Sequence, residues 1–239
     1  MAITFQSKII KITDLTPSSK SFIITTPAEF IYQAGQFVMI TLEIAQSDGS
    51  IKKIKRSYSI ASTPTRSNEI ELAIKLVSGG ALTTWLFSTA KIGTFVEVSG
   101  PFGNFFLKKE DKPKTLYLIS AGSGVAPVLS IMRDQIARGG KTPIVWISSN
   151  KLPNDIEYVD EIRVTAANHK IPTLFAATQP CTDMECHLGR IDKSVLEKMC
   201  PTKKDALVFM CGPPVFVDAI SAILIEMGFD ASQVRKEKF

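Results

Sequence analysis

The pattern of apolar residues changes near residue 110, and this change limits the folds open to a chain of 239 residues. Before it, short runs of β-branched and aromatic residues alternate with turn residues, a pattern typical of strands. Six short strands with one short helix near residues 81–89 predict a small antiparallel barrel. The predicted strands cover residues 4–12, 20–26, 36–44, 56–61, 69–77 and 94–99.

Beyond residue 114, predicted strands alternate with predicted helices. The run TLYLIS (115–120) is continuously apolar, as expected for a strand buried on both faces. The alternation predicts a doubly wound parallel sheet with right-handed crossovers. The remaining predicted elements are strands at 142–148, 171–177 and 206–210 and helices at 126–138, 155–168, 192–199 and 214–227.

A charged segment that contains Pro113, residues 108–114, separates the two patterns. Its composition is typical of a linker between domains, and we interpret its charges as a solvated surface. The predicted fold class is therefore α/β plus all-β. We expect a six-stranded antiparallel barrel domain at 1–108 and a doubly wound parallel α/β domain at 113–239.

Composition excludes several classes of protein. With 45% hydrophobic and 21% charged residues, the chain is neither disordered nor fibrous. It contains no run of about 18 apolar residues that would predict a membrane-spanning helix. Its N-terminus has no secretory signal pattern, so we expect a cytoplasmic protein. The net charge of +5 is too mild to indicate nucleic-acid binding.

The cysteines raise the possibility of a metal site. Cys181, Cys186 and His187 lie close together in the sequence, but no second cysteine pair with matching spacing accompanies them. We therefore expect loop cysteines without a metal. In a reducing compartment all four cysteines, Cys181, Cys186, Cys200 and Cys211, are expected to be free thiols.

Two glycine-containing loops follow predicted strands of the second half, where open parallel sheets bind ligands. In AGSGVAP (121–127), glycines allow a tight turn, and the next helix directs its free N–H groups at an anion. In MCGPP (210–214), Cys211 stands at the end of its strand. Taken alone, AGSGVAP is also compatible with a plain strand–helix turn, and Cys211 is equally compatible with core packing.

The first half contains two further candidate binding motifs. In RSYSIAS (56–62), Arg56 has the fork geometry that binds a diphosphate, and Tyr58 offers a ring for stacking and a hydroxyl. The segment LVSGGALTTWL (76–86) places glycines before a short helix, a second possible phosphate cradle. Taken separately, both motifs also occur as ordinary surface and turn sequences.

Taken together and in order, seven motifs resemble the ferredoxin–NADP reductase superfamily, and in particular its bacterial oxygenase reductases and flavohaemoglobin reductase domains. The resemblance covers essentially the whole chain and implies a flavin-binding barrel followed by a nicotinamide-binding α/β domain. The motifs are GQF (35–37), RSYS (56–59), GALT (80–83), GPFG (100–103), GSGVAP (122–127), CGPP (211–214) and EKF (237–239).

The resemblance also implies roles for individual residues. Arg56 would hold the flavin pyrophosphate, and Ser59 would lie near the reactive flavin nitrogen. Cys211 and Glu237 would lie beside the nicotinamide, and Phe239 would cover the flavin. The expected catalytic residues are Ser59, Thr83, Cys211, Glu237 and Phe239. The expected cofactor-binding residues are Arg56, Ser57, Tyr58, Ser59, Ile74, Lys75, Gly80, Ala81, Leu82, Thr83, Gly122, Ser123, Gly124, Pro127, Lys151, Cys211, Gly212, Pro213 and Phe239.

The implied function is a flavoprotein oxidoreductase that takes a hydride from NADH or NADPH onto FAD. Some relatives carry a fused iron–sulfur domain and this chain shows none, so we expect a separate acceptor: a ferredoxin, a flavodoxin or an oxygenase component. Lys151 and Gln179 stand where NADPH-using relatives often carry basic residues, so the choice between NADH and NADPH stays open, with a slight preference for NADH. The alternatives are a reductase of free flavin and, less favoured, a non-catalytic nucleotide-sensing module.

Overall fold

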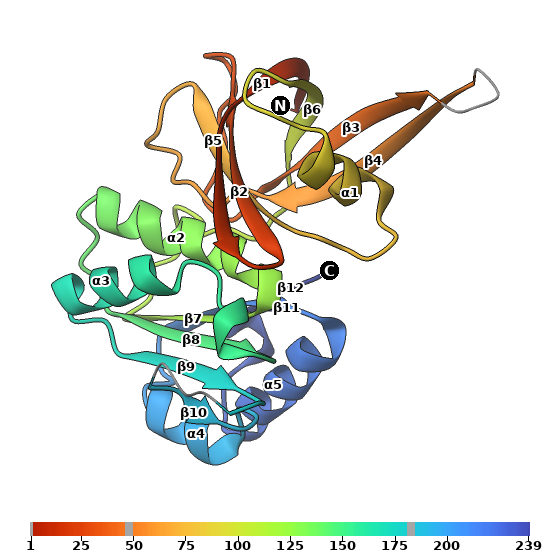
Figure 1. Cartoon of the computed structure of the whole chain (residues 1–239). Helices are drawn as coiled ribbons and strands as arrows, with labels where there is room; N and C mark the ends of the chain where they lie inside the picture. Colours follow the sequence, from red (N-terminus) through yellow and green to blue (C-terminus); the bar gives the residue numbers. More distant parts are fainter. Residues whose placement is uncertain (1, 46–49, 181–184) are drawn as a thin grey trace.

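The computed structural model describes residues 2–45, 50–180 and 185–239. Its N-terminal half is a curled antiparallel sheet with the strand order β4-β3-β6-β1-β2-β5 (Figure 1). An isolated bridge between Ile60 and Leu72 joins the two ends of this sheet and closes the predicted barrel. The elements are β1 (Ile3–Thr16), β2 (Ser19–Thr25), β3 (Phe37–Ala45), β4 (Ile51–Ser59), β5 (Glu69–Lys75), α1 (Ala81–Ser88) and β6 (Phe95–Phe102).

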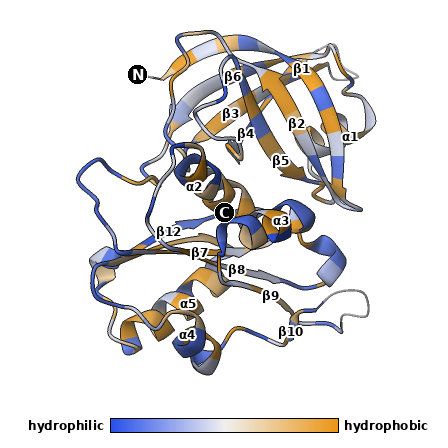
Figure 2. Ribbon diagram, turned by 90° about the vertical axis from the view of Figure 1, so that its left-hand side faces the viewer, coloured by the Kyte–Doolittle hydropathy of each residue, from blue (hydrophilic) through white to orange (hydrophobic). Residues whose placement is uncertain are grey.

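The C-terminal half is a parallel sheet with the strand order β10-β9-β8-β7-β11-β12. Helices α2 and α3 cover the face toward the barrel, and α4 and α5 cover the opposite face (Figure 2). The strands are β7 (Thr115–Ala121), β8 (Ile144–Asn150), β9 (Thr173–Ala177), β10 (His187–Leu188), β11 (Ala206–Gly212) and β12 (Val234–Lys238). The helices are α2 (Val125–Ala137), α3 (Val159–His169), α4 (Lys193–Met199) and α5 (Pro214–Glu226), with 3-10 turns η1 (Gly122–Gly124), η2 (Pro153–Asp155) and η3 (Ala231–Gln233).

Strand β5 joins the two halves because its faces have different partners. Ile70, Leu72 and Ile74 are buried in the barrel core. Side chains alternate across a strand, so the opposite face is available to the second half. Ala73, on that opposite face, packs in the same apolar cluster as α2 and β7. The strand therefore carries the packing from one half into the other.

Several features differ from the sequence-based expectation. Strand β4 begins at Ile51 rather than at residue 56, because the lysine-rich stretch pairs with β3 in a long hairpin. Helix α3 begins at Val159 rather than at 155, because residues 153–155 form a 3-10 turn. Strands β10 and β12 were not predicted. The two-residue strand β10 is placed by pairing with β9. Strand β12, VRKEK, has one apolar residue, and its place is fixed by pairing with β11.

The interpretation of residues 108–114 as a uniformly solvated surface was wrong for Asp111. Its side chain is only 12% exposed and forms an ion pair with Arg235 of β12. Two hydrogen bonds of 2.5 and 2.6 Å join the guanidinium to the two carboxylate oxygens. The neighbouring Lys108 and Lys112 are exposed, as expected. The segment thus connects the halves and also anchors the last strand.

In the part of the chain that the structure describes, no helix is long and apolar enough to cross a membrane.

Candidate active site

A cavity of about 740 Å³ lies between the two halves, within the range of ligand sites. The barrel contributes the ends of β3, β4 and β5, the loop that follows β5, and α1. The second half contributes η1, the start of α2, β11 and the C-terminal strand. The lining residues are Phe37, Arg56, Ser57, Tyr58, Ser59, Ala73, Lys75, Leu76, Val77, Gly80, Ala81, Leu82, Thr83, Ser123, Ala126, Cys211, Glu237, Lys238 and Phe239.

The wall from the second half lies where the order of its strands reverses. β8 to β10 extend to one side of β7, whereas β11 and β12 lie on the other. Ser120 at the end of β7 pairs with Cys211 at the end of β11, so the loops that follow both strands meet there. This reversal point, outside the carboxyl ends of the strands, is where open α/β sheets bind ligands.

The glycines of the first loop allow this close approach. A Cβ atom at position 124 would collide with the carbonyl oxygen of Cys211 and lie 2.8 Å from the amide nitrogen of Gly212. Gly122 has a φ of +54°, which disfavours other residues, and a Cβ there would meet no atom within 4 Å. The loop is therefore packed against β11 on one side and open on the other.

Helix α2 begins at this loop and faces the cavity with its first turn. Ser123 and Ala126 line the cavity, and the free N–H groups of a helix N-terminus favour an anion. Pro127 lies in the first turn of α2, as expected, but it is buried outside the cavity wall. The sequence motif thus lies at the expected place, and two of its residues line the cavity.

Cys211 and Glu237 are neighbours on the paired strands β11 and β12. One carboxylate oxygen of Glu237, Oε2, is buried and has no hydrogen-bond partner among the described residues. Burial raises the pKa of Glu237 to about 7. Burial, and next the negative charge of Glu237, raise the pKa of the Cys211 thiol. The pair is therefore a neutral thiol beside a carboxyl group that exchanges a proton near neutral pH.

The barrel wall carries the four residues of the RSYS motif. All four line the cavity. The guanidinium of Arg56 donates a hydrogen bond of 2.8 Å from Nη1 to the carbonyl oxygen of Lys55. Burial raises the pKa of Tyr58 to about 12, although the charge of Arg56 acts in the opposite direction, so the phenol is neutral. The wall offers a cation, hydroxyl groups and an aromatic ring.

Thr83 shapes the loop that enters helix α1. Its hydroxyl group donates to the carbonyl oxygen of Gly80 at 3.0 Å and accepts from the amide of Val77 at 3.2 Å. A Cβ at position 80 would lie only 2.7 Å from that hydroxyl oxygen. Within the described structure, the Thr83 hydroxyl group is engaged in holding the loop, although the residue also lines the cavity.

Seven predicted binding residues do not line the cavity. The side chain of Ile74 is buried in the barrel core, and Lys151 is exposed beyond the end of β8. The others belong to the two loops of the second half, whose backbones support the cavity wall: Gly122, Gly124, Pro127, Gly212 and Pro213. Their assigned roles stay predictions.

Six lining residues were not predicted: Phe37, Ala73, Leu76, Val77, Ala126 and Lys238. Five belong to segments already named as motifs: Phe37 to GQF (35–37), Leu76 and Val77 to LVSGGALTTWL (76–86), Ala126 to GSGVAP (122–127) and Lys238 to EKF (237–239). Ala73 lies two residues before Lys75, so these two side chains point to the same face of β5.

Among the described residues, no group of three or more His, Cys, Asp or Glu side chains could hold a metal ion. Cys181, one member of the candidate metal clip, lies outside the described residues.

Two family models match the two halves in order. Residues 6–107 match the oxidoreductase FAD-binding domain, and residues 118–222 match the oxidoreductase NAD-binding domain. The chain belongs to the oxidoreductases that join an FAD-binding domain to an NAD-binding domain. FAD and a nicotinamide nucleotide are thus the ligands of its two halves.

Curated relatives are longer than this chain. It is 30% identical over 221 residues to the glycine betaine monooxygenase reductase subunit of Pseudomonas aeruginosa, covering 91% of this chain and 59% of that protein. It is 25% identical over 241 residues to the phenol hydroxylase P5 protein of Acinetobacter pittii, covering 98% of this chain and 65% of that protein. The chain therefore spans about three fifths of these relatives.

Solved structures share the fold over the full length of the chain. A ferredoxin–NADP⁺ reductase from Neisseria gonorrhoeae with bound FAD and NADP has a TM-score of 0.83 at 21% identity and is covered over 98% of both chains. The flavohaem-like FAD/NAD-binding domain of nitric oxide dioxygenase from Vibrio cholerae has a TM-score of 0.86 at 19% identity, also over 98% of both. These likenesses confirm the predicted two-part fold.

Proposed function

We propose that this protein is a member of the ferredoxin–NADP reductase superfamily, an FAD-containing reductase that accepts a hydride from NADH or NADPH and passes the electrons to a separate acceptor protein. The observation that carries the proposal is a single cavity lined by both halves. It brings the RSYS motif of β4, the start of α2 and the Cys211–Glu237 pair to one space. Hydride transfer needs two ring systems in contact, and this space adjoins both binding halves.

The side chains of the cavity suit the two ligands. Arg56 would bind the pyrophosphate of FAD, and Tyr58 would pack against its ring system or ribityl chain. The N–H groups around Ser123 would face the phosphates of the nicotinamide nucleotide. The buried Oε2 of Glu237 has no protein partner, as expected of an atom that meets a ligand. When bound, FAD supplies the ability to accept two electrons together and release them singly.

The chain's own residues would orient the rings, exclude water and hold one proton. Cys211 is 2% exposed, so its neutral thiol fills space beside the site and does not act as a nucleophile. Glu237 holds a proton at its carboxyl group near neutral pH. Both contributions are positional and electrostatic, because the cofactors carry the chemistry.

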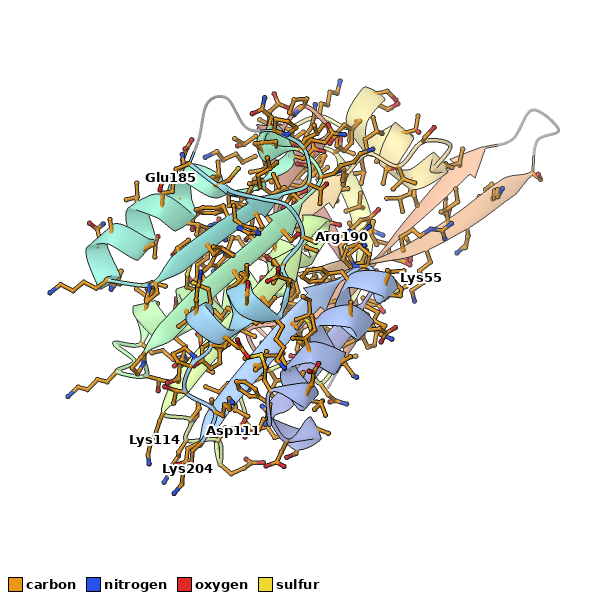
Figure 3. All side chains as sticks on the ribbon, turned by 90° about the horizontal axis from the view of Figure 1, so that it is seen from below. Lys55, Asp111, Lys114, Glu185, Arg190 and Lys204 are labelled. Atoms are coloured by element: carbon orange, nitrogen blue, oxygen red, sulfur yellow. The ribbon has the colours of Figure 1, made fainter. Side chains whose placement is uncertain are left out.

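The acceptor that we propose is an acidic protein, such as a ferredoxin or the acidic face of an oxygenase component. The similarity to reductase subunits of oxygenases, such as that of glycine betaine monooxygenase, supports an oxygenase component as this partner. Strand β4 is an edge strand, and its exposed side chains include Lys52, Lys53, Lys55 and Arg56. Of these four residues, Arg56 also lines the cavity. Lys55 lies far from Lys114 and Lys204 at the other end of the molecule (Figure 3).

The nucleotide preference that we propose is a slight one for NADH. The segment after β8, where a 2′-phosphate would need a cation, offers Lys151 and no arginine. The carbonyl oxygen of Lys151 accepts from the amide of Gln179 at 3.0 Å, so these two residues lie together at the end of the sheet. Steady-state kinetics with NADH and with NADPH measure the preference directly.

The visible absorption spectrum tests the proposed function. Purified protein is expected to be yellow with bound FAD, and anaerobic NADH is expected to bleach that absorption. A colourless protein that reduces only added flavin would instead support a reductase of free flavin. Yellow protein that neither nucleotide bleaches would contradict both and leave the nucleotide-sensing module.

A further inference from the structure

A network of charges, two of its three side chains largely buried, joins the two halves. Glu71 of β5 accepts a hydrogen bond of 2.8 Å from Nη1 of Arg133 on α2. Arg133 also forms two hydrogen bonds, of 2.7 and 2.6 Å, with the carboxylate of Glu161 on α3. The side chain of Glu71 is 8% exposed and that of Arg133 14%. We refer to these three residues as the clasp.

Every polar atom of Glu71 has a defined partner. Its Oε1 accepts from the hydroxyl of Ser21 at 2.7 Å and from that of Tyr158 at 2.9 Å, and its Oε2 accepts from Arg133. Burial alone would raise the pKa of Glu71, but Arg133 and the two hydroxyl donors lower it. The carboxylate therefore stays charged, and the clasp is an ion network at neutral pH.

Helix α2 is fixed to the barrel along one face. Ser130 donates to the carbonyl oxygen of Ser62 at 2.6 Å, and Arg133 donates to that of Ala61 at 2.8 Å. Asp134 accepts from the hydroxyl of Thr63 at 3.2 Å. Residues three and four positions apart share one face of a helix, so all three contacts come from the same side of α2.

Two of the clasp residues lie on elements that also line the cavity, one on each side. Ala126 lines the cavity, and Arg133 follows it by seven residues, about two helical turns on the same side of α2. On the barrel, Glu71, Ala73 and Lys75 share one face of β5, and the last two line the cavity. Ala61 follows Ser59 by two residues. Movement at the clasp would therefore move both walls relative to each other.

Resting on the proposed function, we propose that Glu71, Arg133 and Glu161 are positioning residues that set the separation of the two cavity walls for hydride transfer. None of the three lines the cavity, so they act through α2 and β5. Buried ion pairs often add little net stability, because the cost of removing charges from water offsets their attraction. Their directional hydrogen bonds fix one geometry of the two halves.

The test uses Glu71→Gln and Arg133→Met in the FAD-loaded protein. Because a misplacement of about 1 Å can slow a reaction about 100-fold, we expect the rate of FAD reduction by saturating NADH to fall about 10- to 100-fold in anaerobic stopped flow. FAD affinity should stay within about 2-fold, since no FAD contact is removed. Hydrogen exchange at amides 122–132 should accelerate, a readout independent of activity.

Arg138→Met is the matched control. Arg138 caps the C-terminal end of the same helix, but it pairs with Asp134 of that helix and not with the barrel, and its side chain is 58% exposed. This variant should keep the wild-type rate and exchange. If either clasp variant fails to fold, Glu161→Gln replaces it, because Glu161 is 39% exposed and its loss leaves the Glu71–Arg133 contact. A rate loss of about 3-fold or more is then expected.

Two results separate failure of the clasp from failure of the function. Clasp variants that match wild type in FAD reduction rate and in exchange at amides 122–132 would overturn the proposal. Wild-type protein that neither NADH nor NADPH reduces would overturn the proposed function. In that case, unchanged hydrogen exchange in the variants would still refute the role of the clasp. Faster exchange would support only the claim that the clasp fixes the geometry of the two halves.

Discussion

At the scale of single residues, Glu237 links the site to pH. Its folded pKa of about 7 lies above the ordinary value of 4.5, because burial disfavours the charged form. The stability that protonated Glu237 contributes to the fold is fully present below about pH 4.5 and is lost as the pH rises through about 7. Replacing Glu237 by Gln should remove this loss, so the variant should gain about 2–4 °C in Tm relative to wild type between pH 5 and pH 8.

Thermal unfolding at five or six pH values between 5 and 8 measures this difference. Glu226→Gln is the control, because that carboxylate is exposed and pairs with Lys193 on the surface. A wild-type Tm that runs parallel to that of Glu237→Gln over the whole range would contradict the argument.

Phe239 is the second residue with a direct prediction. Its side chain is 60% exposed although it lines the cavity, so it can move without disturbing the core. We expect it to cover the flavin and to leave when the nicotinamide enters. Deleting it should change the apparent nicotinamide affinity or the FAD reduction rate about 10-fold or more, because stacking area is lost or access is opened. Unchanged stopped-flow kinetics in the deletion variant would refute this role.

At the scale of elements, one ion pair anchors the last strand. Arg235 of β12 contacts both carboxylate oxygens of Asp111, donates to the carbonyl oxygen of Phe106 and lies 5.3 Å from the ring centre of Phe209. Asp111→Asn should destabilise the protein by about 2–4 kcal/mol at pH 7, because it leaves a half-buried guanidinium unpaired. It should also lower the FAD reduction rate, because β12 carries Glu237.

The size of this effect should depend on pH. Hydrogen bonds from Arg235 lower the pKa of Asp111, although burial acts in the opposite direction. The pair therefore stabilises the fold above the ordinary pKa of an aspartate and is lost as pH falls through the lower, folded value. Urea unfolding at pH 7 and at pH 3 should show a smaller difference in stability between Asp111→Asn and wild type at pH 3 than at pH 7. Equal differences at both values would be inconsistent with an ion pair.

At the scale of the whole molecule, charge predicts how the acceptor approaches. The exposed lysines of β4 give this edge a positive field next to the cavity. Lys52→Glu/Lys55→Glu should lower the rate of reduction of an acidic ferredoxin about 10-fold and flatten its dependence on salt. Lys114→Glu, at the distant end of the molecule, serves as the control. Equal salt dependence in the two variants would exclude this edge as the docking surface.

The overall architecture was predictable because it rests on local patterns. Continuous apolar runs such as 115–120 indicate strands buried on both faces, and alternation with helices requires a parallel sheet. The order of β7, α2 and β11 then places two loops at one edge. These loops contribute Ser123 and Cys211 to the cavity, and the family resemblance indicated the RSYS residues that line its other wall.

Other features depended on contacts between segments distant in the sequence. Strand β12 has a largely polar sequence, and only pairing with β11 makes it a strand. Asp111 and Arg235 are separated by 124 positions, so no local pattern marks their ion pair. The same holds for the clasp, whose residues come from three elements in two halves.

The sequence by itself thus determined the two kinds of sheet, the order of the elements and the motifs at strand ends, because periodicity and turn chemistry act over a few residues. The tertiary structure alone decided the placement of β12, the raised pKa of Glu237 and the charge network behind the cavity. These depend on burial and on distances across the fold, which are set only when the two halves pack together.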